Sequence, residues 1–267
     1  MSEQPFEVVV VGSLNLDLIV RASRLPERGE TVLGSTSTTA AGGKGLNQAV
    51  AAARQGARTV IIGAVGSDAY GDELVAMAGA EGIDVSAVTR HLHAGTGVAH
   101  ISVEDSGANT IVVVPRANGT VDTGLVGRHA DVIARAAVLL VQLEIPLDGV
   151  RTAIELARAA GVAVVLNPAP ARPLPHDLLA LCDVVVPNES EAALLTGHDT
   201  TSEAGATASA RALVAMGAGA AIVTLGHRGA VVATAEGASQ LVRPFPVAAR
   251  DSTAAGDAFC GTLAAGL

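Results

Sequence analysis

Residues 138–166 read VLLVQLEIPLDGVRTAIELARAAGVAVVL and carry the pattern that is most informative about the fold. A short aliphatic run at 138–143 is followed by a segment with helical spacing at 148–160, and a second aliphatic run follows at 162–166. Continuous aliphatic runs of this length are typical of strands that are buried on both faces. The stretch therefore predicts two parallel strands joined by a helix.

The same alternation extends along most of the chain. We expect buried strands at 7–11, 59–65, 138–143, 162–166, 183–186, 220–225 and 230–233, and helices at 44–55, 71–80, 148–160, 189–195 and 203–216. This order indicates an α/β fold, a doubly wound and mostly parallel sheet with helices on both faces. Residues 16–39 and 96–114 instead alternate polar and apolar side chains, as half-exposed strands do. No linker or repeat divides the chain, so we expect one domain over 1–267.

Composition excludes several classes of function. The 267 residues carry a formal charge of -9, and only one Tyr, three Phe and no Trp are present. An acidic chain with so few aromatic rings does not fit a nucleic-acid-binding protein. No apolar run approaches membrane-spanning length, and the two cysteines, Cys182 and Cys260, fit reduced thiols. The sequence thus predicts a cytoplasmic protein that binds neither nucleic acid nor membrane.

The segment 251–257, DSTAAGD, places small residues before an apolar helical run. Backbone N–H groups of Ala254, Ala255 and Gly256 could close on an anion at a helix N-terminus. Asp257 beside that anion could take a proton from a hydroxyl nucleophile, as phosphoryl transfer requires. The alternative is an ordinary helix cap, because Ser, Thr and Asp commonly precede apolar helices.

A second glycine-rich segment, AGGKGLNQ at 41–48, opens a predicted helix and contains Lys44, the only lysine of the chain. Lys44 offers a compact positive charge within a turn that exposes its backbone. The alternative is chance, since a single lysine must fall somewhere. The segment is not a Walker loop, in which the lysine follows a longer glycine-spaced run and precedes Ser or Thr.

Further polar residues occupy positions where ligands bind in α/β folds. Asn15 and Asp17 lie two apart after a predicted strand and so share one face, where an amide and a carboxylate could bind sugar hydroxyls. An Asx turn is the alternative for this pair. Asn47 follows Lys44 by three residues on one helical face, and Glu144 ends the strand 138–143.

Six segments in this order resemble the ribokinase-like carbohydrate kinases, the phosphofructokinase-B family. They are GSLNLD at 12–17, the glycine-lysine turn, GSDAYG at 66–71, NPAPAR at 167–172, PNESE at 187–191 and the AAGD of 254–257. The segment NPAPA and the glycine-lysine turn are most similar to the ribose kinases of that family.

The resemblance implies a role for each of these positions. Asn15, Asp17, Gly42, Gly43, Lys44, Asn47 and Glu144 would line the sugar pocket, and Asp257 would be the catalytic base beside the amides of Ala254, Ala255 and Gly256. Asn188, Thr224, Gly226 and Gly229 would contact the nucleotide, Glu191 would position Mg²⁺ through water, and Asp251 with the Thr253 carbonyl would bind a monovalent cation, K⁺. The spacing of Asn188 and Glu191 also fits a helix cap with an acidic first turn.

The implied reaction is ATP-dependent phosphorylation of D-ribose at its 5-hydroxyl, with the segments 16–39 and 96–114 forming a lid over the sugar and a homodimer contact. Kinases for deoxyribose, a ketose or a nucleoside are alternatives within the family. The lid segments contain no aromatic residue, which argues against a nucleoside. Family members extend beyond residue 267, so we expect the C-terminal part of the family domain, with its adenine cover, to be missing. A non-catalytic sugar-binding protein is therefore the alternative from another class.

Overall fold

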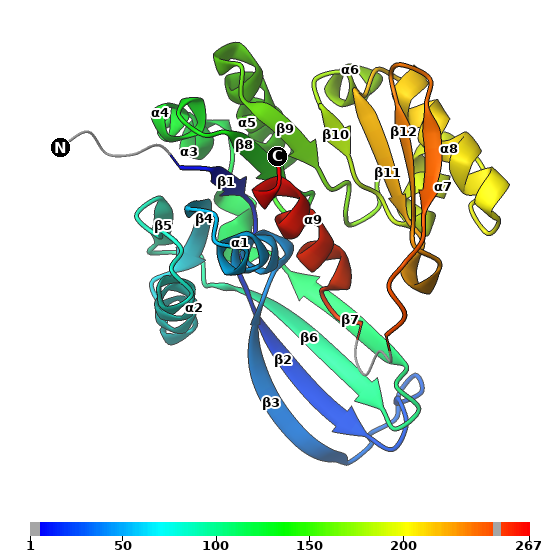
Figure 1. Cartoon of the computed structure of the whole chain (residues 1–267). Coiled ribbons are helices and arrows are strands. Elements are labelled where there is room, and N and C mark those ends of the chain that lie inside the picture. The colour runs from blue at the N-terminus through cyan, green and yellow to red at the C-terminus, as the bar shows by residue number, and fades with distance from the viewer. Residues whose placement is uncertain (1–5, 248–251) are drawn as a thin grey trace.

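Two β-sheets organise the molecule, as Figure 1 shows. The larger has nine strands in the order β13-β12-β11-β10-β9-β8-β1-β4-β5, and the smaller has four in the order β3-β2-β6-β7. The structure is a computed structural model and describes residues 6–247 and 252–267.

The large sheet is parallel over most of its width, which confirms the predicted α/β fold. Every neighbouring pair from β11 to β5 is parallel, whereas β12 and β13 run antiparallel at one edge. The strands are β1 (Val8–Val11), β4 (Thr59–Gly66), β5 (Val88–His91), β8 (Val138–Val141), β9 (Ala163–Leu166), β10 (Val184–Val185), β11 (Ala220–Thr224), β12 (Ala230–Thr234) and β13 (Ser239–Val242). The two edge strands, β5 and β13, were not predicted, because they are partly exposed and lack a continuous aliphatic run.

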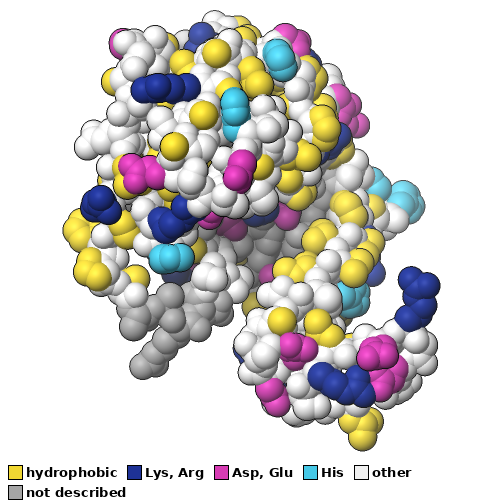
Figure 2. Space-filling view, turned by 90° about the vertical axis from the view of Figure 1, so that its right-hand side faces the viewer, with side chains coloured by type: hydrophobic (Ala, Val, Ile, Leu, Met, Phe, Trp, Pro, Cys, Tyr) yellow, Lys and Arg dark blue, Asp and Glu magenta, His cyan; other side chains and the backbone are white. Residues whose placement is uncertain are grey.

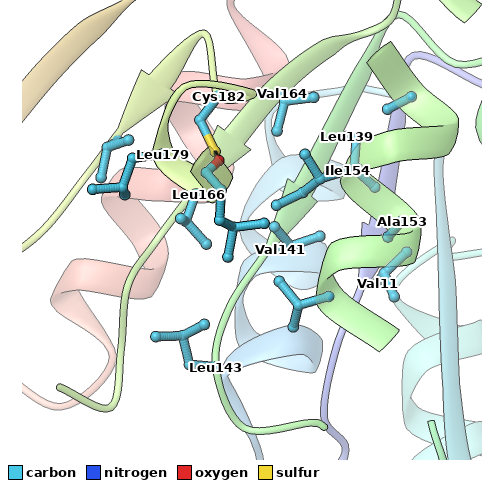
Figure 3. Packing of buried hydrophobic residues seen from close by; sticks show 14 of the residues in the cluster. Val11, Leu139, Val141, Leu143, Ala153, Ile154, Val164, Leu166, Leu179 and Cys182 are labelled. Carbon is cyan, nitrogen blue, oxygen red and sulfur yellow. Dashed lines mark hydrogen bonds between the residues drawn. The ribbon is translucent and has the colours of Figure 1, made fainter. Parts of the chain in front are cut away.

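Helices cover both faces of this sheet. On one face Val8 and Val10 of β1 pack in a cluster with α1 (Lys44–Arg54), α2 (Ala69–Ala80) and α9 (Ala255–Ala265). On the other face Val9 and Val11 pack with the remaining helices. Figure 3 shows part of this second core, in which Ile154 of α5 lies among Leu139, Val141 and Val164.

The helices on the second face are α3 (Thr123–Gly127), α4 (Ala130–Ala134), α5 (Leu147–Ala160), α6 (His176–Leu179), α7 (Glu189–Thr196) and α8 (Glu203–Ala215). The five predicted helices are observed with small shifts of their ends. α2, for example, begins early because the Asp68 carboxylate caps it and accepts a hydrogen bond from the Gly71 N–H. The short helices α3, α4 and α6 have too few residues for a periodic pattern and were not predicted.

The small sheet, which we call the lid, consists of β2 (Asn15–Ala22), β3 (Gly34–Gly42), β6 (Gly97–Glu104) and β7 (Asn109–Val114). The two segments predicted to break the alternation fall on these strands. In Figure 1 the lid extends away from the carboxyl end of β1, and Figure 2 shows its outer end as a lobe where side chains of both charges gather. Within the described ranges, no helix has the length and apolarity needed to cross a membrane.

Candidate active site

The candidate site lies where β1, β8 and β9 end and where α1 and α9 begin. Ligands of open α/β sheets bind at this edge, because the helix N-termini and the loops that follow the strands meet there. Residues from both ends of the chain meet at this edge, since α1 packs against α9.

The glycines of the turn before α1 allow a close approach to the segment after β1. Gly43 has a φ of 90°, and a Cβ atom there would lie 2.8 Å from the Asn15 nitrogen. A Cβ at Gly45 would lie 2.5 Å from the nitrogen of Ser13. Both positions therefore exclude a side chain, and Gly43 also needs a backbone region that L-residues disfavour.

The N-terminus of α1 is already occupied by protein groups. The Lys44 N–H donates to Glu144 Oε2 at 2.9 Å, and the Ser13 hydroxyl donates to the same oxygen at 2.6 Å. The Gly45 and Leu46 N–H groups donate to the hydroxyl and carbonyl oxygens of Ser13. Glu144 is thus the anion at this helix end, and the glycine turn provides close packing around it.

Asp17 lies beside the other end of the same turn. A Cβ atom on Gly42 would be 2.3 Å from Asp17 Oδ2, so Gly42 leaves room for this carboxylate. Burial and, secondly, the negative charge of Glu144 raise the pKa of Asp17 from 3.8 to about 6. The site thus holds two neighbouring carboxylates, Asp17 and Glu144.

Asn15 is buried and held in one orientation by Asn118 of the 3₁₀ turn η1 (Arg116–Thr120). Asn118 Nδ2 donates to Asn15 Oδ1 at 2.7 Å and to the Leu14 carbonyl at 3.0 Å, and its Oδ1 accepts from the Leu14 N–H. Because the Asn15 oxygen is engaged, its Nδ2 group is left to donate to a ligand.

Asp257 lies in the first turn of α9, with 5% of its surface exposed. Its Oδ2 accepts from Asn47 Nδ2 at 3.1 Å, and its Oδ1 accepts from Gln48 Nε2 at 2.9 Å. Lys44 Nζ lies 3.9 Å from Oδ1. The structure therefore brings Asp257 together with Lys44 and Asn47, which lie more than 200 residues earlier in the sequence.

The backbone at the start of α9 is unusual. Ala254, the residue before the helix, has left-handed dihedrals with φ 57° and ψ 12°. The Ala255 N–H donates to the Ser252 carbonyl at 3.2 Å, while Gly256 lines a cavity together with Asp257. Thr253 lies next to this turn, in the wall of a separate cavity. Asp251 lies outside the described residues.

Glu191 and Asn188 form a capping box at α7, which confirms the cap interpretation of their spacing. Glu191 Oε2 accepts from the Asn188 N–H and Oε1 accepts from Asn188 Nδ2. Burial is the main cause that raises the pKa of Glu191. Glu191 also lines the cavity of about 50 Å³ that Lys44 and Asp257 line, so a second carboxylate borders the same space as Asp257.

A larger cavity of about 470 Å³ adjoins this small one, and Thr224 and Gly256 line both. Gly226, Gly229, Phe245 and Phe259 also line the larger cavity. The predicted nucleotide loop, Thr224, Gly226 and Gly229, therefore faces a mainly apolar space that leads to Asp257.

Residues 6–267 match the model of the pfkB family carbohydrate kinases. The chain belongs to this family. It is therefore a carbohydrate kinase of the ribokinase type, a phosphotransferase.

Several relatives in this family are similar over nearly the whole chain. A ribokinase of Schizosaccharomyces pombe is 42% identical over 265 residues, which cover 96% of this chain and 83% of the relative. A deoxyribokinase of Salmonella typhi is 36% identical and covers 97% of this chain and 84% of the relative. A structure of Arabidopsis thaliana ribokinase complexed with ribose and ATP has a TM-score of 0.91 at 30% identity and covers 98% of this chain and 85% of that one.

Sequence reasoning missed the buried polar residues that hold the site of this family member together. These are Ser13, Gln48, Asn118, Gln142 and Asn167. One signal was available: Gln142 is a single amide within a buried aliphatic strand run, where a polar residue needs a partner. The partners themselves come from distant segments, so the sequence could not pair them.

Proposed function

We propose that this kinase transfers the γ-phosphoryl group of ATP to the 5-hydroxyl of D-ribose and forms D-ribose 5-phosphate. The observation that carries the proposal is the position of Asp257 between two sets of residues. Lys44 connects it to Glu144, whose charge acts on Asp17, and Gly256 connects it to the cavity of the Thr224 loop. The similar Arabidopsis protein was solved with ribose and ATP, which supports the same pair of ligands here.

Recognition of the sugar falls to Asp17 and Asn15 on the lid strand β2. The Asp17 carboxylate accepts hydrogen bonds from two hydroxyl groups, and the Asn15 amide donates to another. Glu144 Oε1, on the carboxylate whose Oε2 is held by Ser13 and Lys44, offers a further acceptor. These groups bind a polyhydroxylated ligand and reject an apolar one, because unpaired buried carboxylates are costly.

Asp257 removes the proton of the reacting hydroxyl while that oxygen attacks the γ-phosphorus. The Ala255 N–H donates to the Ser252 carbonyl, so Gly256 and Asp257 are the residues of the first turn of α9 whose N–H groups would meet the phosphoryl group, and the helix dipole favours negative charge there. Gly256, beside Asp257, exposes its backbone to the shared cavity. These groups and Lys44 stabilise the charge that develops on the transferred phosphoryl group.

The residues present fit a magnesium ion held mostly by phosphate and water. Among described residues, no group of three or more His, Cys, Asp or Glu side chains could hold a metal alone. Mg²⁺ needs few protein carboxylates, and Glu191 is the one that would orient its water shell. The ion would neutralise phosphate charge when bound with ATP. A K⁺ site at Asp251 and the Thr253 carbonyl stays a prediction, which a comparison of turnover in potassium and in sodium salts checks.

A deoxyribose kinase is the second candidate, because deoxyribokinases are 36% identical to this chain. The two sugars differ at one hydroxyl, so the ratio of the kcat/KM values for the two sugars decides between them.

An ADP-release assay should compare ribose, 2-deoxyribose, fructose and adenosine, with Asp257→Asn as the inactive control. We expect ribose to give the highest kcat/KM and Asp257→Asn to lower kcat by about 10²- to 10⁴-fold. A higher kcat/KM for 2-deoxyribose would refute the ribose assignment, and an active Asp257→Asn variant would refute the base.

We also propose that two copies associate through their lids. Strand β7 is one of the two edge strands of the lid, and its side chains Ile111, Val112, Val113 and Val114 are 39 to 63% exposed. An exposed aliphatic edge strand is a favourable surface for pairing with another chain.

A further inference from the structure

A row of buried amides lies directly behind Asp257. Gln48 of α1, Gln142 after β8 and Asn167 after β9 have exposed fractions of 0%, 0% and 7%. Asn167 borders the small cavity beside Asp257, whereas Gln48 and Gln142 are not among the residues that line it. Asn167 and Gln142 are hydrogen-bonded to Gln48, and Gln48 alone donates to one oxygen of the Asp257 carboxylate.

The hydrogen bonds fix the orientation of Gln48. Its Nε2 donates to Asp257 Oδ1 at 2.9 Å and to Asn167 Oδ1 at 3.0 Å, and its Oε1 accepts from Gln142 Nε2 at 2.6 Å. A flipped amide would place Gln48 Oε1 against two other oxygens, so only one orientation is stable.

Asn167 cannot turn its amide either. Its Nδ2 donates to the Val186 carbonyl at 2.8 Å, which directs its Oδ1 towards Gln48. The series therefore starts at a backbone carbonyl and ends at Asp257, with each amide oriented by the previous one.

Gln142 supplies the hydrogen bond that orients the Gln48 amide oxygen. Gln142 Oε1 is buried without a hydrogen-bond partner in the described part of the chain, and a Cβ atom on Gly12 would lie 2.2 Å from it. Nε2 of the same amide donates to Gln48 Oε1, so an aliphatic side chain at this position would leave that buried acceptor without its donor. The Gln142 amide is thus explained by its donation to Gln48.

We propose that Gln48, oriented by Gln142 and Asn167, is a positioning residue that holds the Asp257 carboxylate towards the reacting hydroxyl. The proposal rests on Asp257 as the base of the proposed function. Asn47 holds Oδ2 from the pocket side, and Gln48 holds Oδ1 from the core side. Because both oxygens are held, the Asp257 carboxylate cannot rotate. A small displacement of the carboxylate from the reacting hydroxyl would lower the reaction rate strongly.

The principal test is Gln48→Met, which keeps the length of the side chain and removes both functions of the amide. We expect kcat to fall about 10- to 100-fold while KM for ribose changes less than about 3-fold. Ala49→Gly, in the same helix and equally buried, is the matched control for loss of packing. It should leave kcat per folded molecule unchanged. An unchanged kcat in Gln48→Met, or an equal loss in Ala49→Gly, would overturn the proposal.

A double-mutant cycle separates positioning from general destabilisation. In the Asp257→Asn background, Gln48→Met should have no further effect on the residual rate, because there is no base left to orient. If Asp257→Asn retains full activity, the proposed base is wrong. If Asp257→Asn is impaired and the two losses multiply, only the positioning role is wrong.

Gln48→Glu provides a variant with a second readout and nearly the same shape. A second carboxylate beside Asp257 favours the protonated form of the pair, so the low-pH limb of the kcat profile should move to higher pH. The other charged or titratable groups that act around Asp257 are Lys44, Glu191 and Cys260, and they are the same in both proteins. A pH profile that coincides with that of the unmodified enzyme would contradict the contact between residue 48 and the base.

Discussion

The raised pKa of Asp17 predicts that this residue lowers the stability of the free protein. In the folded state the pKa is about 6, above the ordinary value of 3.8, because of burial and the neighbouring Glu144. Between these two values the folded protein binds more protons than the unfolded chain, so the free energy of unfolding falls as pH rises through this window. Above pH 6 the ionised Asp17 lowers the free energy of unfolding by its full amount, and below about pH 4 this destabilisation is absent.

The size of the effect follows from the shift. About two pKa units correspond to about 3 kcal/mol, and since Asp17 is only partly buried, solvent screening reduces the expected cost to about 1 to 2 kcal/mol. Asp17→Asn keeps the shape beside Gly42 and removes the charge. We therefore expect it to raise the free energy of unfolding by about 1 to 2 kcal/mol near pH 8, with Tm higher by about 3 to 6 °C.

The same substitution should weaken sugar binding. Loss of a charged acceptor costs about 1.5 to 3 kcal/mol, so the dissociation constant of ribose should rise by about ten- to a few-hundred-fold. In the unmodified protein, affinity should fall as pH decreases below about 6, because the protonated carboxyl is a poorer acceptor for hydroxyl groups. Thermal unfolding across pH and calorimetric titration with ribose measure the two effects separately.

Asp105→Asn is the matched control, since Asp105 is an exposed acid in the turn between β6 and β7 of the same lid. It removes one negative charge and should change stability by less than about 0.5 kcal/mol. If Asp17→Asn were less stable than the unmodified protein near pH 8, or equally stabilised at pH 4, the reasoning from burial would be refuted. Equal ribose affinity in both proteins would remove Asp17 from the sugar site.

Three other substitutions test separate parts of the structure. Gly43→Ala should destabilise the protein by about 1 to 3 kcal/mol more than Gly56→Ala in denaturant titrations, because both glycines have φ near 90° but only Gly43 is crowded. Similar losses for both would show that the dihedral alone matters. Asn118→Ala should raise KM for ribose more than it lowers kcat, since it frees the Asn15 amide, and an unaltered KM would speak against that role. Val112→Lys should shift a lid-mediated dimer towards monomer in sedimentation experiments, because an edge lysine opposes strand pairing; a dimer of unchanged strength would place the contact elsewhere.

The elements of the nine-stranded sheet that could be predicted are those with a continuous aliphatic run, such as β1 and β8, or a long periodic helix such as α5. The sequence was less informative about β13, whose exposed residues alternate over only four positions. The strands of the lid were predicted from the alternation of their residues, whereas their assembly into a lid was implied only by the resemblance to the family. The pairing of β2 with both β3 and β6 depends on contacts between distant segments, which local patterns do not contain.

In the site, too, some residues could be predicted from local sequence patterns and others depend on contacts between distant segments. Asp257 and Lys44 could be predicted because a carboxylate after small residues and a single lysine in a glycine turn are rare in this composition. Gln48 stood in the same quoted segment but had no distinguishing chemistry of its own. Its role depends on Gln142 and Asn167, which lie 94 and 119 residues away in sequence.

The two glycine-rich helix starts show why similar motifs differ in function. From sequence, both α1 and α9 resemble anion-binding N-termini. At α1 the first N–H groups donate to Glu144 and Ser13, so the positive helix end stabilises a carboxylate of the protein. At α9 the first turn instead borders the cavity shared with Lys44 and Glu191. In the proposed reaction, the phosphoryl group would therefore meet the dipole of α9, whereas the dipole of α1 would act on Glu144 and, through it, on the sugar. A charge-neutral Glu144→Gln variant should consequently alter KM for ribose far more than KM for ATP, and the reverse pattern would exchange the two assignments.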